Sequence, residues 1–147
     1  MHLDENGERV TPLYDYLKTM PEGIVESIYE RYGGKQEFLR KTASPALGML
    51  NSGFQILWLK KQKSELFRKI KHSLHLPNYL SFVLTQMPES EYTSIGCHTA
   101  MWDFDEMKYH LWLTDEGISS LPKPVPNNTI HKASLDNEQV KVGIEIG

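Results

Sequence analysis

The sequence predicts a helix-rich α/β fold. Its 147 residues are enough for one ordinary domain, or a portion of one, with a buried core. The strongest helical signal lies between residues 47 and 58, where apolar residues recur at the spacing of one helix face. The strongest strand signal runs from Val140 to Ile146, where apolar and other residues alternate. The two periodicities together favour an α/β fold.

The N-terminal region predicts a tight turn followed by a helix. Asn6 and Gly7, which tolerate positive φ, lie between two short strand-like segments. Pro21 suits the first turn of a helix, and the apolar spacing after it predicts a helix of about three turns. Gly33 and Gly34 end this helix.

The middle of the chain predicts two helices separated by a strand. The first helix begins after Pro45 and carries the periodic apolar face. Residues 64–67 predict a short turn, and the segment Ile70–Leu76 alternates like a half-buried strand. Pro77 opens the second helix, whose residues 79–84 are so apolar that we expect it to be well buried.

The last third predicts a helix, a connector and a strand. The carboxylates of Asp103, Asp105 and Glu106 suit a helix N-terminus, so we expect a helix from there to about Gly117. Three alternate prolines predict an extended connector over residues 121–128. The final strand runs into the last residue without a turn, and we interpret this as a cut domain.

Composition excludes several classes of partner. The formal net charge is -3, which supplies no positive field for nucleic acid or an anionic membrane. The longest apolar run, residues 56–59, is far short of the roughly 20 residues that cross a bilayer. No secretion signal opens the sequence, and the single cysteine, Cys97, excludes an internal disulfide. These features favour a soluble protein of the cytoplasm.

The histidines and the cysteine suggest two kinds of site, a metal site and a nucleophile with its base, and the sequence favours neither. His72 and His75 would point to opposite faces of a strand, and no second ligand pair follows with zinc-finger spacing. Cys97 and His98 are adjacent, and adjacent side chains rarely face one another as a nucleophile and its base. We therefore expect no metal site, and a packed, inert thiol at Cys97.

Tryptophan could stack a sugar ring, but Trp58 lies on the periodic helix face and is expected in the core. The sequence has no phosphate-binding loop of the Gly-x-x-x-x-Gly-Lys type, and Gly33-Gly34-Lys35 fits a helix end better. The residues taken singly predict an α/β domain and no catalytic group.

Five distinctive segments follow one another along the chain. They are Ala43-Ser44-Pro45, Leu50-Asn51-Ser52-Gly53-Phe54-Gln55 through Trp58-Leu59, Leu74-His75-Leu76-Pro77-Asn78-Tyr79-Leu80-Ser81, Thr93-Ser94-Ile95-Gly96-Cys97-His98-Thr99 and Trp102-Asp103-Phe104. In this order they resemble the FGGY family of carbohydrate kinases, and they are more similar to members that phosphorylate ketoses, such as xylulose, fuculose or rhamnulose, than to the glycerol-specific branch. The resemblance covers roughly residues 1 to 147 and is most specific from Ala43 to Trp102.

The resemblance implies a partial ribonuclease H-like domain of the actin and hexokinase superfamily. Residues 1–147 would be an internal part of the kinase N-terminal domain, without its phosphate-binding Asp-x-Gly-Thr turn and without the catalytic Asp turn. The implied parent enzyme uses ATP and Mg²⁺ to phosphorylate a sugar hydroxyl. This chain alone would have no catalytic residue, bind neither ATP nor Mg²⁺, and be inactive.

The resemblance further implies that the chain supplies walls of the sugar pocket. The polar candidates are Asn51, Ser52, His98 and Thr99, and the alternative for each is helix packing or capping. Leu50 stands where glycerol-using relatives have a substrate-contacting tyrosine.

Two other hypotheses remain open. One is a stand-alone sugar-binding or interaction protein derived from a kinase domain, and the other is a metal-dependent hydrolase built on the histidines. An incomplete domain would also leave apolar helix faces uncovered, so we expect exposed apolar surface and self-association.

Overall fold

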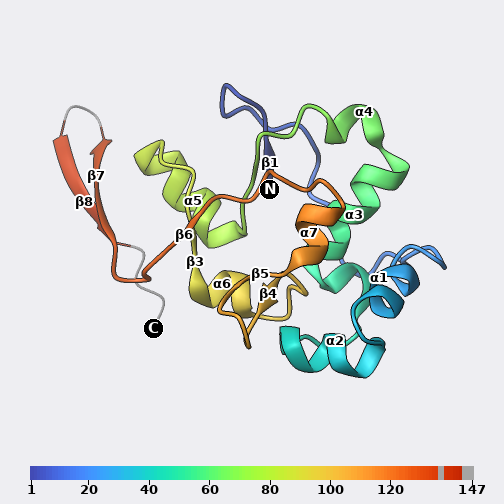
Figure 1. Cartoon of the computed structure of the whole chain (residues 1–147). Coiled ribbons are helices and arrows are strands. Elements are labelled where there is room, and N and C mark those ends of the chain that lie inside the picture. The colour runs from blue at the N-terminus through green and yellow to red at the C-terminus, as the bar shows by residue number, and fades with distance from the viewer. Residues whose placement is uncertain (136–137, 144–147) are drawn as a thin grey trace. The chain divides into compact units, whose positions relative to one another are not determined.

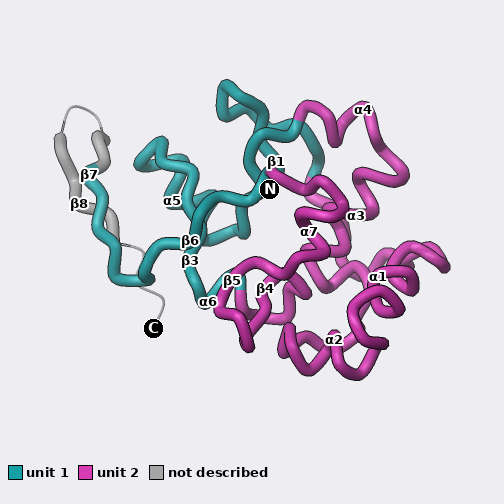
Figure 2. The backbone as a smooth tube through the Cα atoms, viewed as in Figure 1, with its two compact units in different colours: residues 1–12, 70–95, 120–147 teal, residues 13–69, 96–119 magenta. Residues whose placement is uncertain are grey.

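The chain folds as two compact units of helices and short strands (Figures 1 and 2). This computed structural model describes residues 1–135 and 138–143. Unit 1 comprises Met1–Pro12, Ile70–Ile95 and Ser120–Gly147, and unit 2 comprises Leu13–Lys69 and Gly96–Ser119. Each unit therefore assembles segments that are far apart in the sequence, and the predicted helix-rich α/β class is confirmed.

Unit 2 is mainly helical. Its elements are α1 (Glu26–Arg31), α2 (Lys35–Thr42), the 3₁₀ helix η1 (Gly48–Leu50), α3 (Ser52–Gln62), α4 (Ser64–Phe67), the strands β4 (Trp102–Asp103) and β5 (Lys108–Tyr109), and α7 (Leu111–Asp115). Aromatic rings form its core. Phe38 stacks on Phe54 with centroids 5.9 Å apart, while Tyr29 meets both rings edge-on and Trp112 lies 5.6 Å from Phe54.

The expected helices of this unit are broken by special backbone positions. The first helix begins at Glu26 rather than Pro21, because Gly23 has a φ of 79° that a helix cannot accommodate. The long periodic segment is split into η1 and α3, because Gly48 has a φ of 58° and Asn51 is extended. The sequence pattern did not predict α2.

The predicted helix from Asp103 to Gly117 is wrong in its first half. Residues 102–109 form the antiparallel β4–β5 hairpin, in which Trp102 pairs with Tyr109. The Asp103 carboxylate caps a turn, accepting hydrogen bonds from the backbone N–H groups of Asp105 and Glu106 at 3.0 and 3.1 Å. The helix is only α7, and Gly117, with a φ of 64°, ends it as expected.

The described residues of unit 1 form short paired strands and two helices. β1 (His2–Leu3) pairs antiparallel with β2 (His72–Ser73), β3 (Ser90–Glu91) pairs parallel with β6 (Pro124–Val125), and β7 (Ile130–Leu135) pairs antiparallel with β8 (Glu138–Gly143). The helices are α5 (Leu76–Thr85) and α6 (Tyr92–Gly96).

The turn and strands predicted for the segments of unit 1 are confirmed in part. The turn after β1 is confirmed, since Asp4 N–H donates to Glu8 O at 2.9 Å and Leu3 bridges Arg9. The strand expected over residues 70–76 shrinks to β2. The strand expected over residues 140–146 coincides with β8 up to Gly143, and its remainder lies outside the described residues.

The expectation that α5 is well buried is wrong. Leu80 and Val83 are 57% and 50% exposed, whereas Asn78 and Ser81 are buried with Phe82. Apolar composition alone does not determine which helix face is covered. The expected exposed apolar surface is therefore present, on this helix. Among the described residues, no helix is both long and apolar enough to cross a membrane.

Candidate functional site

The two candidate pairs, Asn51 with Ser52 and His98 with Thr99, come together in unit 2. The Asn51 side-chain N–H donates to the His98 carbonyl at 2.8 Å, across 47 positions of sequence. The backbone N–H of Gly53 donates to the Thr99 carbonyl at 2.9 Å. The residue 98–99 segment therefore lies directly against the N-terminal end of α3.

Asn51 is fully buried and holds three backbone segments together. Its amide nitrogen donates to the Pro45 and His98 carbonyls, and its Oδ1 accepts from the Leu47 N–H at 2.9 Å. Both amide hydrogens are thereby used, which leaves one acceptor lone pair on Oδ1. Asn51 is placed to position its neighbours.

Residues 98–100 are held in an unusual conformation. His98 and Ala100 have φ values of 54° and 61°, in the left-handed region that non-glycine residues rarely occupy. The Ala100 N–H donates to the Ser44 hydroxyl at 2.9 Å, and the Ala100 carbonyl accepts from the Trp112 indole at 2.7 Å. This anchoring leaves the His98 side chain exposed.

Thr99 and Ser52 differ in exposure. Thr99 is 3% exposed, and its hydroxyl accepts from the Met101 N–H at 3.1 Å. Ser52, the first residue of α3, is partly exposed. Of the four candidates, Ser52 and His98 therefore have side chains that solvent reaches.

Gly53 is a positioning residue that the sequence reasoning missed. A Cβ at this position would lie 2.5 Å from Met101 Cγ and 2.8 Å from the Thr99 carbonyl oxygen, so only glycine allows α3 to approach this segment. A glycine inside a helical apolar pattern was the available signal. Ser44, which anchors Ala100, gave no such signal.

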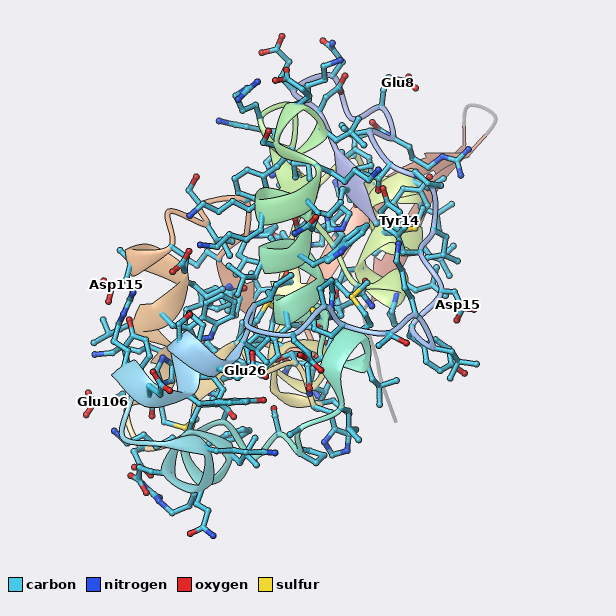
Figure 3. All side chains as sticks on the ribbon, turned by 90° about the vertical axis from the view of Figure 1, so that its right-hand side faces the viewer. Glu8, Tyr14, Asp15, Glu26, Glu106 and Asp115 are labelled. Carbon is cyan, nitrogen blue, oxygen red and sulfur yellow. The ribbon has the colours of Figure 1, made fainter. Side chains whose placement is uncertain are left out.

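Apolar and aromatic side chains near the site divide into exposed and buried groups. Leu47 and Leu50 are 44% and 42% exposed, beside Asn51 in the chain. Trp58 is buried as predicted, with Tyr14 edge-on at 5.1 Å and the Lys18 ammonium 4.4 Å from its ring centroid. Of these three side chains, Tyr14 is labelled in Figure 3. Trp102 and Trp112 are also buried, so none of the three tryptophans offers an open face for stacking.

One buried carboxylate of unit 2, that of Glu116, is ionised and paired. Glu116 lies within 4 Å of the Lys60, Lys61 and Arg31 cations. Burial raises the pKa of this carboxyl, but the Lys60 hydrogen bond and the charges of both lysines outweigh it and leave the pKa below its usual value. A low pKa makes Glu116 a stabilising ion-pair partner rather than a base poised near neutral pH.

The histidine and cysteine candidates belong to different units. His72 and His75 belong to unit 1, whereas Cys97 and His98 belong to unit 2. In the part of the chain that the structure describes, no group of three or more His, Cys, Asp or Glu side chains could hold a metal ion. Cys97 is exposed, so the prediction of a packed thiol is wrong. It directly precedes the turn in which His98 and Ala100 have left-handed φ values.

Comparison with known proteins identifies the relatives of this chain. A sequence model described as the N-terminal domain of the FGGY family of carbohydrate kinases matches residues 1–146. Rhamnulokinases of Halalkalibacterium halodurans and Oceanobacillus iheyensis are each 28% identical over 109 residues, which cover 70% of this chain and 23% of theirs. The chain thus spans about a quarter of the length of these curated relatives.

Solved structures agree on the fold. A carbohydrate kinase from Novosphingobium aromaticivorans superimposes with a TM-score of 0.77 and 25% identity, over 97% of this chain and 32% of that one. A xylulose kinase from Lactobacillus acidophilus matches with a TM-score of 0.68 and 22% identity, over 88% of this chain and 26% of that one. The predicted ribonuclease H-like class of the actin and hexokinase superfamily is confirmed. Because the family model matches nearly the whole sequence, the chain belongs to the FGGY family of carbohydrate kinases.

Proposed function

We propose that this chain is part of an ATP-dependent sugar kinase that phosphorylates a ketose or a related polyol, and that it supplies walls of the sugar pocket. The observation that carries the proposal is the convergence of residues 51–52 with residues 98–99, joined by the Asn51–His98 hydrogen bond of 2.8 Å. The similarity to rhamnulokinases and to a xylulose kinase supports the substrate class.

The four site residues would have two roles, contact with the sugar and support of the contacting residues. Ser52 and His98 are the groups that would contact sugar hydroxyls, because solvent reaches their side chains. Asn51 and Thr99 are buried and would hold that surface in place. The exposed side chains of Leu47 and Leu50 would face the apolar C–H groups of the sugar.

ATP and Mg²⁺ would be bound by other parts of the enzyme. The described residues offer no group of three or more His, Cys, Asp or Glu side chains for a metal ion. Bound ATP would supply the phosphoryl group. Residues 1–147 would form an internal part of the N-terminal domain, lacking the phosphate-binding turn and the catalytic Asp turn, and would be inactive alone. The parent enzyme would work in the cytoplasm, where the free, exposed thiol of Cys97 stays reduced.

The test compares ATP-dependent phosphorylation of a ketose panel by the full polypeptide that the gene encodes and by the 147-residue chain. We expect activity in the full polypeptide only. Within it, Ser52→Ala and His98→Ala should each raise KM for the ketose about tenfold and leave KM for ATP unchanged, because each loses one hydrogen bond to the sugar.

The matched control is Glu65→Ala, which removes a side chain of unit 2 that is 81% exposed. It should leave both KM values as they are. Unchanged ketose KM in both site variants would contradict the assigned contacts, and a folded full polypeptide that phosphorylates no ketose would contradict the substrate class.

A second candidate function is a stand-alone sugar-binding protein derived from a kinase domain. The observation that favours it is that unit 2 carries all four site residues and has its own aromatic core. Titration calorimetry of the 147-residue chain with the same ketoses tests it. Binding by the chain, together with no phosphorylation by the full polypeptide, would favour this candidate.

A further inference from the structure

The turn at residues 98–100 contains two residues in a strained backbone conformation. His98 and Ala100 have φ values of 54° and 61°. For a residue with a side chain, the left-handed region is higher in energy than the helical or extended regions. Such a conformation persists only where surrounding contacts hold it. The turn therefore depends on the hydrogen bonds that its backbone makes.

Helices α3 and α7 bind the carbonyl groups of this turn. The carbonyls of residues 98 and 99 accept hydrogen bonds from the Asn51 amide at 2.8 Å and from the Gly53 N–H at 2.9 Å. The Ala100 carbonyl accepts from the Trp112 indole N–H at 2.7 Å. All three consecutive carbonyls are thus bonded to residues of unit 2.

Ser44 contacts the strained residue itself. Its hydroxyl accepts from the Ala100 N–H at 2.9 Å and donates to the Thr42 carbonyl at 2.9 Å. Ser44 and Ala100 are 2% and 1% exposed, so bulk water cannot replace either bond. Because the Trp112 indole holds the carbonyl on the other side, the two hydrogen bonds fix the directions of both peptide groups that flank the Ala100 Cα atom. These directions determine its φ and ψ.

His98 is the residue that this turn presents to solvent. Its side chain is exposed, whereas Thr99 and Ala100 are 3% and 1% exposed. A side chain on a fixed backbone loses less conformational entropy when it binds a ligand than one on a mobile backbone. The bonded turn therefore orients the imidazole before a ligand arrives.

We propose that Ser44 and Trp112 are positioning residues, which hold Ala100 in its left-handed conformation and thereby orient the His98 imidazole toward a sugar hydroxyl. This inference rests on the proposed function, because His98 is the contact through which both residues act. Neither would touch the sugar, since both are buried. Loss of either bond would let Ala100 move to a backbone region that alanine prefers, and the imidazole would move with it.

The kinetic test uses Ser44→Ala and Trp112→Phe in the full polypeptide that the gene encodes. Each removes one hydrogen bond to Ala100, and each should raise KM for the ketose about fivefold and leave KM for ATP unchanged. In a His98→Ala background the same changes should raise the ketose KM no further, because they act through that imidazole. The matched control, Thr42→Val, removes another buried hydroxyl hydrogen bond of unit 2 and should leave the ketose KM unchanged.

A structural readout separates this inference from the proposed function. In the ¹⁵N-labelled 147-residue chain, a strong nuclear Overhauser effect between the amide proton and the Hα of one residue marks a positive φ, because the two protons are closest in that conformation. We expect a strong signal at Ala100 in the unchanged chain and in Thr42→Val. It should weaken in Ser44→Ala and in Trp112→Phe.

Two results would overturn the inference. An unchanged signal at Ala100 in both Ser44→Ala and Trp112→Phe would show that these bonds do not hold the turn. A rise in ketose KM that persists in the His98→Ala background, or that Thr42→Val reproduces, would show loss of stability rather than positioning. A full polypeptide that phosphorylates no ketose would contradict the proposed function and the sugar contact with it, while the signal at Ala100 still reports whether Ser44 holds the turn.

Discussion

Unit 2 and unit 1 differ in how their interiors are filled. In unit 2 the aromatic rings of Phe38, Phe54 and Trp112 are fully buried, and the buried Asn51 amide makes three hydrogen bonds. In unit 1 a smaller apolar cluster of Leu3, Leu74 and Phe82 is accompanied by buried polar atoms. Of these, the Asn78 amide and the Ser90 hydroxyl have no partner in the described part of the chain.

The difference indicates which unit has the more stable interior. A closed aromatic core with satisfied polar groups can be stable by itself, whereas buried polar groups without partners subtract from stability. The proposed sugar site lies on unit 2, and the exposed apolar side chains of α5 lie on unit 1. The first two pairs of mutations below each compare one residue of unit 2 with its counterpart in unit 1.

The largest expected effect is in the cores. Phe54→Ala should lower the free energy of unfolding by about 3–5 kcal/mol, because the ring is fully buried among aromatic neighbours. Phe82→Ala should lower the free energy of unfolding by less than half as much, because the apolar cluster around Phe82 is small. Urea unfolding of the 147-residue chain measures both. Equal losses would refute the contrast between the cores.

The next largest effect on stability distinguishes the two buried asparagines, Asn51 and Asn78. Asn51→Ala should cost about 2–3 kcal/mol, because it leaves the Leu47 N–H and two carbonyls without their partner. Asn78→Leu should be neutral or stabilising, because the amide it removes has no partner to lose. Both changes are checked by urea unfolding. A substantial loss from Asn78→Leu would mean that its amide is satisfied after all.

The sequence predicted the fold class, but not the backbone positions that shape the site. The resemblance of the ordered segments identified the family, and helical spacing placed Leu57 and Trp58 in the core. Periodicity could not show the break at Asn51, because side-chain pattern carries little information on a single extended residue between two helical segments.

The hairpin at residues 102–109 shows a second limit. Carboxylates at Asp103 and Asp105 suit a helix start and a turn equally well, and the Met107 φ of 50° that closes the turn leaves no mark in the sequence. For α5, the apolar composition was visible, but which face of the helix is buried depends on tertiary packing that composition does not encode.

The smallest expected effect is pH-dependent and belongs to unit 1. Burial, helped by the N-terminal ammonium and opposed by Glu91, lowers the pKa of His75 from 6.5 to about 4. The unfolded state then binds more protons between these values, so stability is full above pH 6.5 and falls as the pH drops toward 4. From pH 7.5 to 5.5 the loss from this group should be about 1 kcal/mol.

The variant His75→Gln isolates this contribution. Its free energy of unfolding, measured by urea titration at both pH values, should fall by about 1 kcal/mol less than that of the unchanged chain. An identical pH dependence in the two proteins would show that His75 is not held neutral by burial.

The most direct test of the account is amide hydrogen exchange across the 147-residue chain, because it reports the two units separately. We predict that the amides of α5 exchange at least about tenfold faster than those of α3, because the apolar cluster under α5 is small and the buried Asn78 amide has no partner in the described part of the chain. Equal or slower exchange in α5 would contradict the claim that the interior of unit 2 is the more stable one.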